Sequence, residues 1–164
     1  MVLDRGVMDE FRTHVGLSHL AESTRYCNYS KDKFNNQVTF IKPCWLSMED
    51  TDEGREVTRD WNFDILDGCA TIAEEGEFDN ARDAFLTSLN VAEHCYFELL
   101  AKGWTPQQAR SVLPLSVKSE LISCGFEDAW SNFFFRRNAK DAHPIAQEIA
   151  RPMHKEFIKL GYCK

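Results

Sequence analysis

A long helical repeat with clear stop and start signals does most to limit the folds open to this chain. From Asn80 to Ala101 the apolar residues recur every three or four positions, as they do on one face of an α-helix. Lys102-Gly103 follows, and glycine suits the left-handed position just past a helix end. Thr105-Pro106-Gln107-Gln108 then has the form of a helix start, with threonine as the cap and glutamine three residues later. The sequence therefore predicts a long helix, a turn and a short second helix that carries Arg110.

Other helices are predicted from apolar spacing and from proline. Val7, Phe11 and Val15 share one face at a spacing of four. Pro144 suits a first helical position, and Pro152 lacks the N–H that would complete the ladder, so we expect a bend there. The expected helices run from Gly6 to about Gly16, from Glu127 to Arg137 and from Pro144 to about Leu160.

Strand signals are weaker and shorter. The polar stretch from Ser18 to Ser30 is interpreted as a loop that enters a strand at Thr24 to Tyr29. A turn over Lys31 to Asn36 and a second strand at Val38 to Ile41 would complete a hairpin. Leu115 to Ser123 alternates enough for a strand or an extended connector. The charged run Glu49 to Arg59 is interpreted as a solvated loop.

Composition limits the classes of partner. With 164 residues, 43% of them hydrophobic, the chain fits one compact domain over residues 1–164. The net charge of -7 argues against a nucleic-acid polymer or an anionic membrane as the main partner. No apolar run reaches the ~18 residues of a membrane span, and the first residues do not form a signal peptide, so we expect a soluble, cytoplasmic protein. The 6 cysteines are scattered singly, so we expect reduced thiols and no metal site.

Arginines on separate predicted elements are the main candidates for chemistry. Arg25, Arg110 and Arg137 each lie beside small or polar residues rather than in a charge run. Guanidinium groups from different elements suit a phosphate, because each planar fork donates two hydrogen bonds to two oxygens. Ser23 adds a hydroxyl donor. The alternative reading from spacing alone is that each arginine forms a surface ion pair, worth under ~1 kcal/mol.

Several segments occur together in a characteristic order and spacing over most of the chain. They are Arg5-Gly6-Val7, Ser18, Glu22-Ser23-Thr24-Arg25-Tyr26-Cys27-Asn28-Tyr29-Ser30, Gly103-Trp104-Thr105-Pro106-Gln107-Gln108-Ala109-Arg110-Ser111-Val112-Leu113-Pro114 and Ala142-His143-Pro144. Together they resemble the flavin-dependent (ThyX-type) thymidylate synthases.

The resemblance implies an α/β (α+β) fold, with helices packed on a small, mostly antiparallel sheet, and a homotetramer with active sites between subunits. Such enzymes methylate dUMP to dTMP with FAD, NADPH and methylenetetrahydrofolate. By position in the family motifs, the candidate nucleotide-binding residues are Glu22, Ser23, Arg25, Arg110 and Arg137. The candidate cofactor-binding residues are His14, Ser18 and His143. His143 before Pro144 can equally be a helix-entry residue that forms hydrogen bonds.

The flavin side of the family pattern is altered. The family signature reads Arg-His-Arg, two spacers and Ser, whereas this chain has Thr13-His14-Val15-Gly16-Leu17-Ser18. Phe126 and Asp128 stand where the family usually has Asn and Arg. A pyrophosphate would meet repulsion where the family offers donors, so FAD binding is doubtful. We also expect the family's N-terminal strands ahead of this helix to be missing.

These observations leave two functions open. The first is a protein that binds a pyrimidine nucleotide of the dUMP or uridine type without flavin catalysis, and so sequesters or senses it. The second is an active, divergent thymidylate synthase that still uses FAD. A third, blander reading is a family relic that acts only as an assembly partner.

Overall fold

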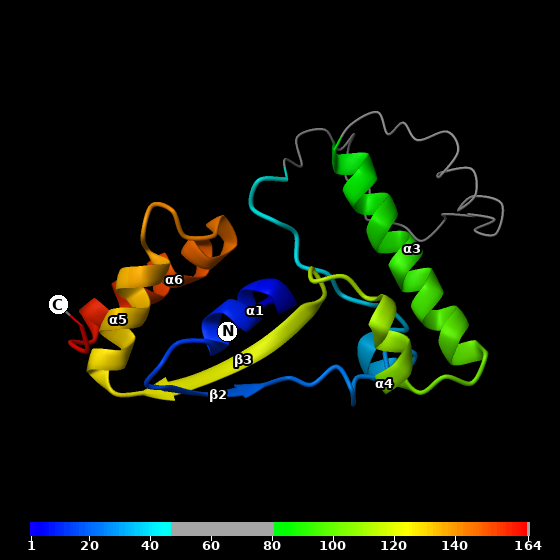
Figure 1. Ribbon diagram of the computed structural model, residues 1–164, viewed down its shortest axis with the longest axis horizontal. Coiled ribbons are helices and arrows are strands. Elements are labelled where there is room, and N and C mark those ends of the chain that lie inside the picture. Colours follow the sequence, from blue (N-terminus) through cyan, green and yellow to red (C-terminus); the bar gives the residue numbers. More distant parts are fainter. Residues whose placement is uncertain (47–80, 164) are drawn as a thin grey trace.

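The computed structural model describes residues 1–46 and 81–163, which form a narrow sheet with helices at both ends (Figure 1). Along the chain the elements are β1, α1, β2, a 3-10 turn, α3, α4, a second 3-10 turn, β3, α5 and α6. This arrangement is the expected α+β fold. The charged run Glu49 to Arg59, predicted to be a solvated loop, lies outside the described residues.

The N-terminus forms strand β1 (Val2–Asp4) and then helix α1 (Arg5–Arg12). Asp4 is the N-cap of the helix, and its Oδ1 accepts the backbone N–H of Val7 at 2.8 Å. The apolar face of α1 is buried against the sheet through Val7, Met8 and Phe11. This confirms the predicted helix, but β1 was not predicted.

Helix α1 is shorter than its apolar spacing predicts. It ends at Arg12, and Gly16 with a φ of 89° turns the chain into strand β2 (Leu17–Ala21). Val15, expected on the buried face, is 88% exposed. The extension to Gly16 is therefore wrong, because the left-handed glycine interrupts the helical repeat.

Strand β3 (Lys118–Gly125) is the centre of the sheet, whose order is β1-β3-β2. Both pairings are antiparallel, with Leu3 opposite Ser119 and Leu20 opposite Ile122. The expected small antiparallel sheet is confirmed. The predicted strand at Leu115 to Ser123 is confirmed with bounds a few residues later.

The polar segment before residue 30 does not form the predicted strand. Instead the Tyr26 N–H donates to the Ser23 carbonyl at 3.1 Å, and Asn28 Oδ1 accepts the Ser30 N–H at 3.0 Å. Short polar side chains compete with strand pairing by binding nearby backbone groups. The strand at Thr24 to Tyr29 is therefore wrong, and turns take its place.

The predicted hairpin is also wrong. Its turn exists, with a 3-10 helix at Asp32–Phe34 followed by left-handed Asn35 and Asn36. Its second strand does not, since Phe40 forms an isolated bridge to Val117 beside β3. Pairing with a segment distant in sequence replaces the local hairpin.

Two hydrophobic clusters lie at the two ends of the sheet. In the first, buried aromatic and aliphatic side chains of α5 (Glu127–Arg137) and α6 (Pro144–Lys159) pack with those of α1. In the second, α3 (Ala81–Ala101) and α4 (Pro106–Ala109) enclose Tyr96 and Ala109. These four helices, like α1, were predicted and are confirmed, and α6 continues through Pro152.

Candidate functional site

The turn between α3 and α4 is built by the residues that predicted it. Gly103 has a φ of 89°, and the Thr105 N–H donates to Gln108 Oε1 at 2.9 Å. Ala109 is fully buried, so α4 is fixed against α3. This rigid corner brings Gln107 and Arg110 to the segment that contains Thr24 and Arg25.

Two side-chain hydrogen bonds join these segments. Arg110 Nη1 donates to Thr24 Oγ1 at 2.8 Å, and Arg25 Nε donates to Gln107 Oε1 at 3.1 Å. Thr24 is buried and Arg110 is half-buried, whereas Arg25 is exposed. We call Ser23, Thr24, Arg25, Gln107 and Arg110 the arginine patch.

The arginine patch retains its positive charge. Both hydrogen-bond partners of its guanidinium groups are neutral, a hydroxyl and an amide oxygen. Within residues 1–46 and 81–163, neither Arg25 nor Arg110 forms an ion pair with a carboxylate. The reading of these two arginines as surface ion pairs therefore has no support in the described part of the chain.

Glu22 lies at the edge of the arginine patch and is paired with a lysine. Its Oε2 is 3.5 Å from Lys118 Nζ, and its Oε1 is 3.7 Å from Cys27 Sγ. Burial, together with the Glu22 carboxylate, raises the pKa of the Cys27 thiol. Burial works against the Lys118 charge, but Glu120 and Glu22 outweigh it and raise the pKa of Lys118. The charge of Glu22 is thus already balanced by Lys118, whereas Arg25 and Arg110 have no carboxylate partner among the described residues.

Arg137 lies in a different environment, between α5 and α1. Its Nε donates to His14 Nε2 at 2.7 Å, and its Nη1 and Nη2 donate to the carboxylate and the backbone carbonyl of Glu10 at 2.5 and 2.8 Å. The Arg137 side chain is 17% exposed. Every nitrogen of this guanidinium therefore has a partner within the same chain.

His14 is held as a neutral hydrogen-bond acceptor. Burial first, and then the charge of Arg137, lowers the pKa of His14 from 6.5 to about 4. Its ring also packs edge-on against Phe133, at 4.9 Å between ring centroids. His14 is consequently part of the packed core near α5 and carries no charge for an anion at neutral pH.

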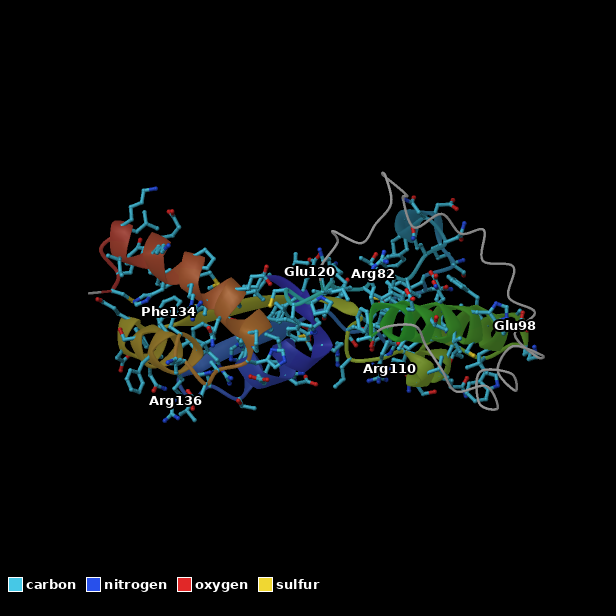
Figure 2. All side chains as sticks on the ribbon, turned by 90° about the horizontal axis from the view of Figure 1, so that it is seen from above. Arg82, Glu98, Arg110, Glu120, Phe134 and Arg136 are labelled. Carbon is cyan, nitrogen blue, oxygen red and sulfur yellow. The ribbon has the colours of Figure 1, made fainter. Side chains whose placement is uncertain are left out.

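The predicted site residues therefore fall into separate groups. Figure 2 shows Arg110 and Arg136, the sequence neighbour of Arg137, in opposite halves of the molecule. Ser18 is exposed on β2, opposite Cys124. His143 is the N-cap of α6 and is exposed, with its ring 5.6 Å from that of Trp45. Within one chain, Ser23, Arg25 and Arg110 lie in one cluster, and His14 and Arg137 form a second, separate cluster.

The residues at the altered flavin positions do not fit a pyrophosphate. The Thr13 hydroxyl donates to the Glu10 carbonyl at 2.7 Å, and Phe126 is 85% exposed. Glu127 and Asp128 occupy the first turn of α5, and Asp128 Oδ1 accepts the Ala129 N–H at 2.8 Å. Carboxylates already satisfy the positive end of this helix and would repel a second anion.

Three residues of these clusters were not singled out from the sequence as site residues. Both Thr24, between Ser23 and Arg25, and Gln107, three positions before Arg110, lie inside the matching motifs. Glu10 lies in the last turn of α1, and His14 lies just after the helix ends at Arg12. The pairing of Glu10 with Arg137, 127 positions away, left no signal in the sequence.

The part of the chain that the structure describes has neither a metal cluster nor a membrane span. There, no group of three or more His, Cys, Asp and Glu side chains could hold a metal ion. Among the same residues, no helix is both long enough and apolar enough to cross a membrane.

Two comparisons with known proteins bear on the family of this chain. A search of curated proteins finds no significant similarity. The family model described as thymidylate synthase complementing protein matches residues 1–160, nearly the whole chain. The chain therefore belongs to the thymidylate synthase complementing protein, or ThyX-type, family.

Proposed function

We propose that this protein binds a pyrimidine nucleotide of the dUMP type at the arginine patch and does not perform the flavin reaction. The observation that carries the proposal is that Arg25 and Arg110 are held by neutral partners, Gln107 and Thr24. Two guanidinium groups that are positioned but not neutralised are suited to an anion.

The hydrogen-bond pattern leaves donors for a phosphate. Gln107 Oε1 accepts the hydrogen bond from Arg25 Nε, and no residue in the described ranges accepts one from the two terminal nitrogens of Arg25. Thr24 Oγ1 accepts one hydrogen bond from Arg110 Nη1, so the other N–H groups of this guanidinium are available as donors. Since Thr24 is buried, it fixes the Arg110 fork in advance of binding, which lowers the entropy lost on binding.

A second copy of the chain would complete the site. Arg137 is bonded to His14 and Glu10, and its sequence neighbour Arg136 lies in the opposite half of the molecule from Arg110 (Figure 2). If Arg137 contributes to the same nucleotide, as the family motif implies, it must come from another subunit. We therefore propose a homo-oligomer with nucleotide sites between subunits, in which a partner subunit also supplies Ser18 and His143.

The proposal of binding without catalysis rests on the altered residues at the family's flavin-binding positions. Thr13, Val15 and Asp128 replace cationic family residues, and α5 begins with two carboxylates. A cytoplasmic protein of this kind would sequester or sense its nucleotide. The alternative is an active synthase that uses FAD, NADPH and methylenetetrahydrofolate, and the observation in its favour is that His14 of the signature is retained, beside Arg137.

Isothermal titration calorimetry with dUMP and uridine tests the proposal. We expect dUMP to bind and uridine, which lacks the phosphate, to bind far more weakly. Arg110→Ala should cost about 2 to 5 kcal/mol of binding free energy if the bound phosphate completes the burial of this half-buried side chain. Arg25→Ala should weaken binding by less, because Arg25 is exposed. Arg151→Ala is the matched control, since Arg151 is exposed on α6 and binds Gln147.

Two results would count against the proposal. Equal affinity for uridine and dUMP would exclude phosphate recognition. Unchanged dUMP affinity in both patch variants would exclude the arginine patch as the site. Retention of added FAD, seen as a visible absorption band after gel filtration, would instead favour the active synthase.

A further inference from the structure

Strand β2 is an edge of the sheet and has no strand on its outer side among the described residues. The strand order is β1-β3-β2, so the neighbour of β2 in this sheet is β3. Figure 1 shows β2 along the border of the molecule, with no other ribbon below it. An edge strand presents a row of N–H and C=O groups that can pair with a further strand.

The outward backbone groups of β2 belong to alternate residues. The Glu22 N–H donates to the Glu120 carbonyl at 2.8 Å, and the antiparallel register is unbroken from there to the start of β2. The even-numbered residues of β2 therefore exchange hydrogen bonds with β3, and the backbone groups of His19 and Ala21 point away from it. A second strand on this side would satisfy these groups.

This edge lacks the usual protection against pairing. Natural edge strands are guarded by charged side chains, by proline or by a β-bulge. The β2 sequence, Leu-Ser-His-Leu-Ala, has no Asp, Glu, Lys, Arg or Pro, and its register with β3 has no bulge. The other edge, β1, is only 3 residues long and ends with the carboxylate of Asp4. Strand β2 is therefore the edge better suited to receive another strand.

The outer face of β2 is apolar as well as exposed. Leu20 is 69% exposed, and Ile122, directly opposite it on β3, is 65% exposed. The other face of the sheet is the one that packs on α1. The solvated face of an antiparallel sheet is usually polar, so this exposed apolar pair is unusual. A strand added at the edge would extend the apolar row and cover part of Leu20.

A second copy of β2 is complementary to this edge. Antiparallel pairing about a two-fold axis at His19 places Ser18 opposite Leu20 of the partner subunit, and the two Leu20 side chains lie diagonally across the axis. Burial, and then the charge of Arg12, lowers the pKa of His19, so the two rings meet uncharged at neutral pH. No charged side chains therefore oppose each other, whereas a charged partner strand would find no opposite charge on β2.

We propose that two copies of this chain associate by antiparallel pairing of their β2 strands, which joins their sheets in the order β1-β3-β2-β2-β3-β1. This contact belongs to the homo-oligomer proposed above and rests on that part of the proposed function. Ser18, which the proposed nucleotide site takes from a partner subunit, lies within the contact.

Analytical ultracentrifugation of the full chain without nucleotide measures the association. Wild type should be a dimer or a multiple of one. Ala21→Pro removes an outward N–H and no bond to β3, so it should halve the molar mass. Leu20→Lys adds a charge to the edge strand of both copies and should weaken association about tenfold or more. If Ala21→Pro does not fold, as judged by circular dichroism, Leu20→Lys carries the test.

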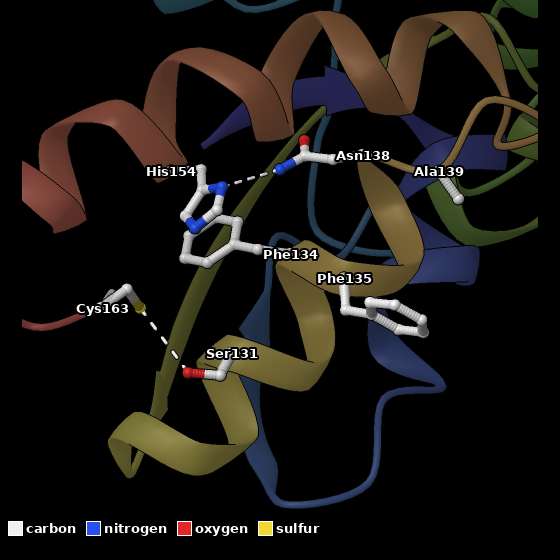
Figure 3. Close-up of a pocket in the computed structure, with 7 residues that line it drawn as sticks. All are labelled: Ser131, Phe134, Phe135, Asn138, Ala139, His154 and Cys163. Atoms are coloured by element: carbon white, nitrogen blue, oxygen red, sulfur yellow. Dashed lines mark hydrogen bonds between the residues drawn. The ribbon is translucent and has the colours of Figure 1, made fainter.

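Two matched controls make the same change, an exposed hydrophobic residue to lysine, at other places. Ile122→Lys lies on the same face of the sheet but on the central strand, so it should associate as wild type does, whereas stacking of two sheet faces would be lost. Phe135 is 81% exposed on α5, and its ring points away from His154 (Figure 3). Phe135→Lys should likewise leave the association unchanged.

Hydrogen exchange followed by NMR tests the register of the pairing. In the wild-type oligomer the amides of His19 and Ala21 should be protected, because they pair with the partner subunit. Leu20→Lys should remove this protection. The Glu22 amide, which donates to β3, should stay protected in both proteins.

The proposal is overturned if wild type is a monomer, if folded Ala21→Pro or Leu20→Lys associates as wild type does, or if either control dissociates as Leu20→Lys does. Protection of His19 and Ala21 in a monomer would also overturn it, because the pairing strand would then belong to the same chain. All these measurements are made without nucleotide, so a failure of dUMP binding leaves them unchanged. Binding of dUMP to a monomer would overturn this contact alone.

Discussion

The buried His14–Arg137 hydrogen bond predicts a specific loss of stability in acid. His14 is 7% exposed and its pKa is lowered to about 4, so the folded protein keeps the ring neutral where an unfolded chain would protonate it. A group whose folded pKa is depressed contributes stability that is full above the unfolded value of 6.5 and is lost as the pH falls toward 4.

The magnitude follows from the two pKa values. A difference of one in pKa corresponds to about 1.4 kcal/mol, so the whole effect is about 3 kcal/mol. Between pH 7 and pH 5 linkage gives a loss of about 2 kcal/mol in the free energy of unfolding from this group alone. Loss of the acceptor of the Arg137 Nε–H bond is one physical source of this cost, because protonated His14 Nε2 cannot accept it.

Urea unfolding of wild type and His14→Gln at pH 7 and pH 5 measures the effect. Glutamine has a carbonyl oxygen that can accept from Arg137 and does not titrate. All other titrating groups are common to both proteins, so subtraction of the two pH dependences isolates His14. Wild type should lose about 2 kcal/mol more than the variant over this range. The same pH dependence in both proteins would refute the buried, neutral His14.

Three further predictions concern stability. Asp4→Ala removes the side-chain cap of α1 and should cost about 1 kcal/mol in urea unfolding, whereas Asp4→Asn or Asp4→Ser should restore most of it. Gly16→Ala should lower the melting temperature more than Gly161→Ala does, although both glycines have positive φ. A Cβ at Gly16 would lie 2.9 Å from Ala129 Cβ, whereas one at Gly161 meets nothing within 4 Å. Equal losses would argue against this close packing. Tyr96→Phe removes a buried hydroxyl that donates to a carbonyl at 3.2 Å and should cost about 1 to 3 kcal/mol in urea unfolding, and a neutral result would mean that this bond adds nothing to stability.

Helices were predictable where their signals are local. The repeat before Ala101, the glycine after it and the Thr105 cap all act within a few residues, and α3 and α4 follow them. Helix α5 has the predicted bounds, Glu127–Arg137, because its aromatic face is continuous. Local signals of this kind do not depend on what the helix packs against.

Strands depended on partners that the sequence does not reveal. Strands β1 and β2 are short, and each is fixed by pairing with β3 about a hundred positions away. The polar segment 24–29 had strand-forming residues, but its side chains bind neighbouring backbone instead. The end of α1 at Arg12 could not be recognised, since the apolar spacing of Val7 and Phe11 continued to Val15.

The candidate site was predictable where it lies within local motifs and unpredictable where it depends on long-range packing. Motif order indicated that Arg25 and Arg110 act together, and the structure brings their segments into contact. The contact between Arg137 and Glu10 depends on how α5 packs on α1, which no local pattern encodes. That a second subunit supplies Arg137 to the nucleotide remains a prediction.

The most direct test of nucleotide binding without flavin is mass spectrometry of the small molecules released when the purified protein is denatured, with the visible spectrum recorded beforehand. The arginine patch, with Arg25 and Arg110 free of ion pairs in the described residues, predicts a pyrimidine nucleotide in a colourless protein. Released FAD from a yellow protein would contradict it and would identify an active flavin-dependent enzyme.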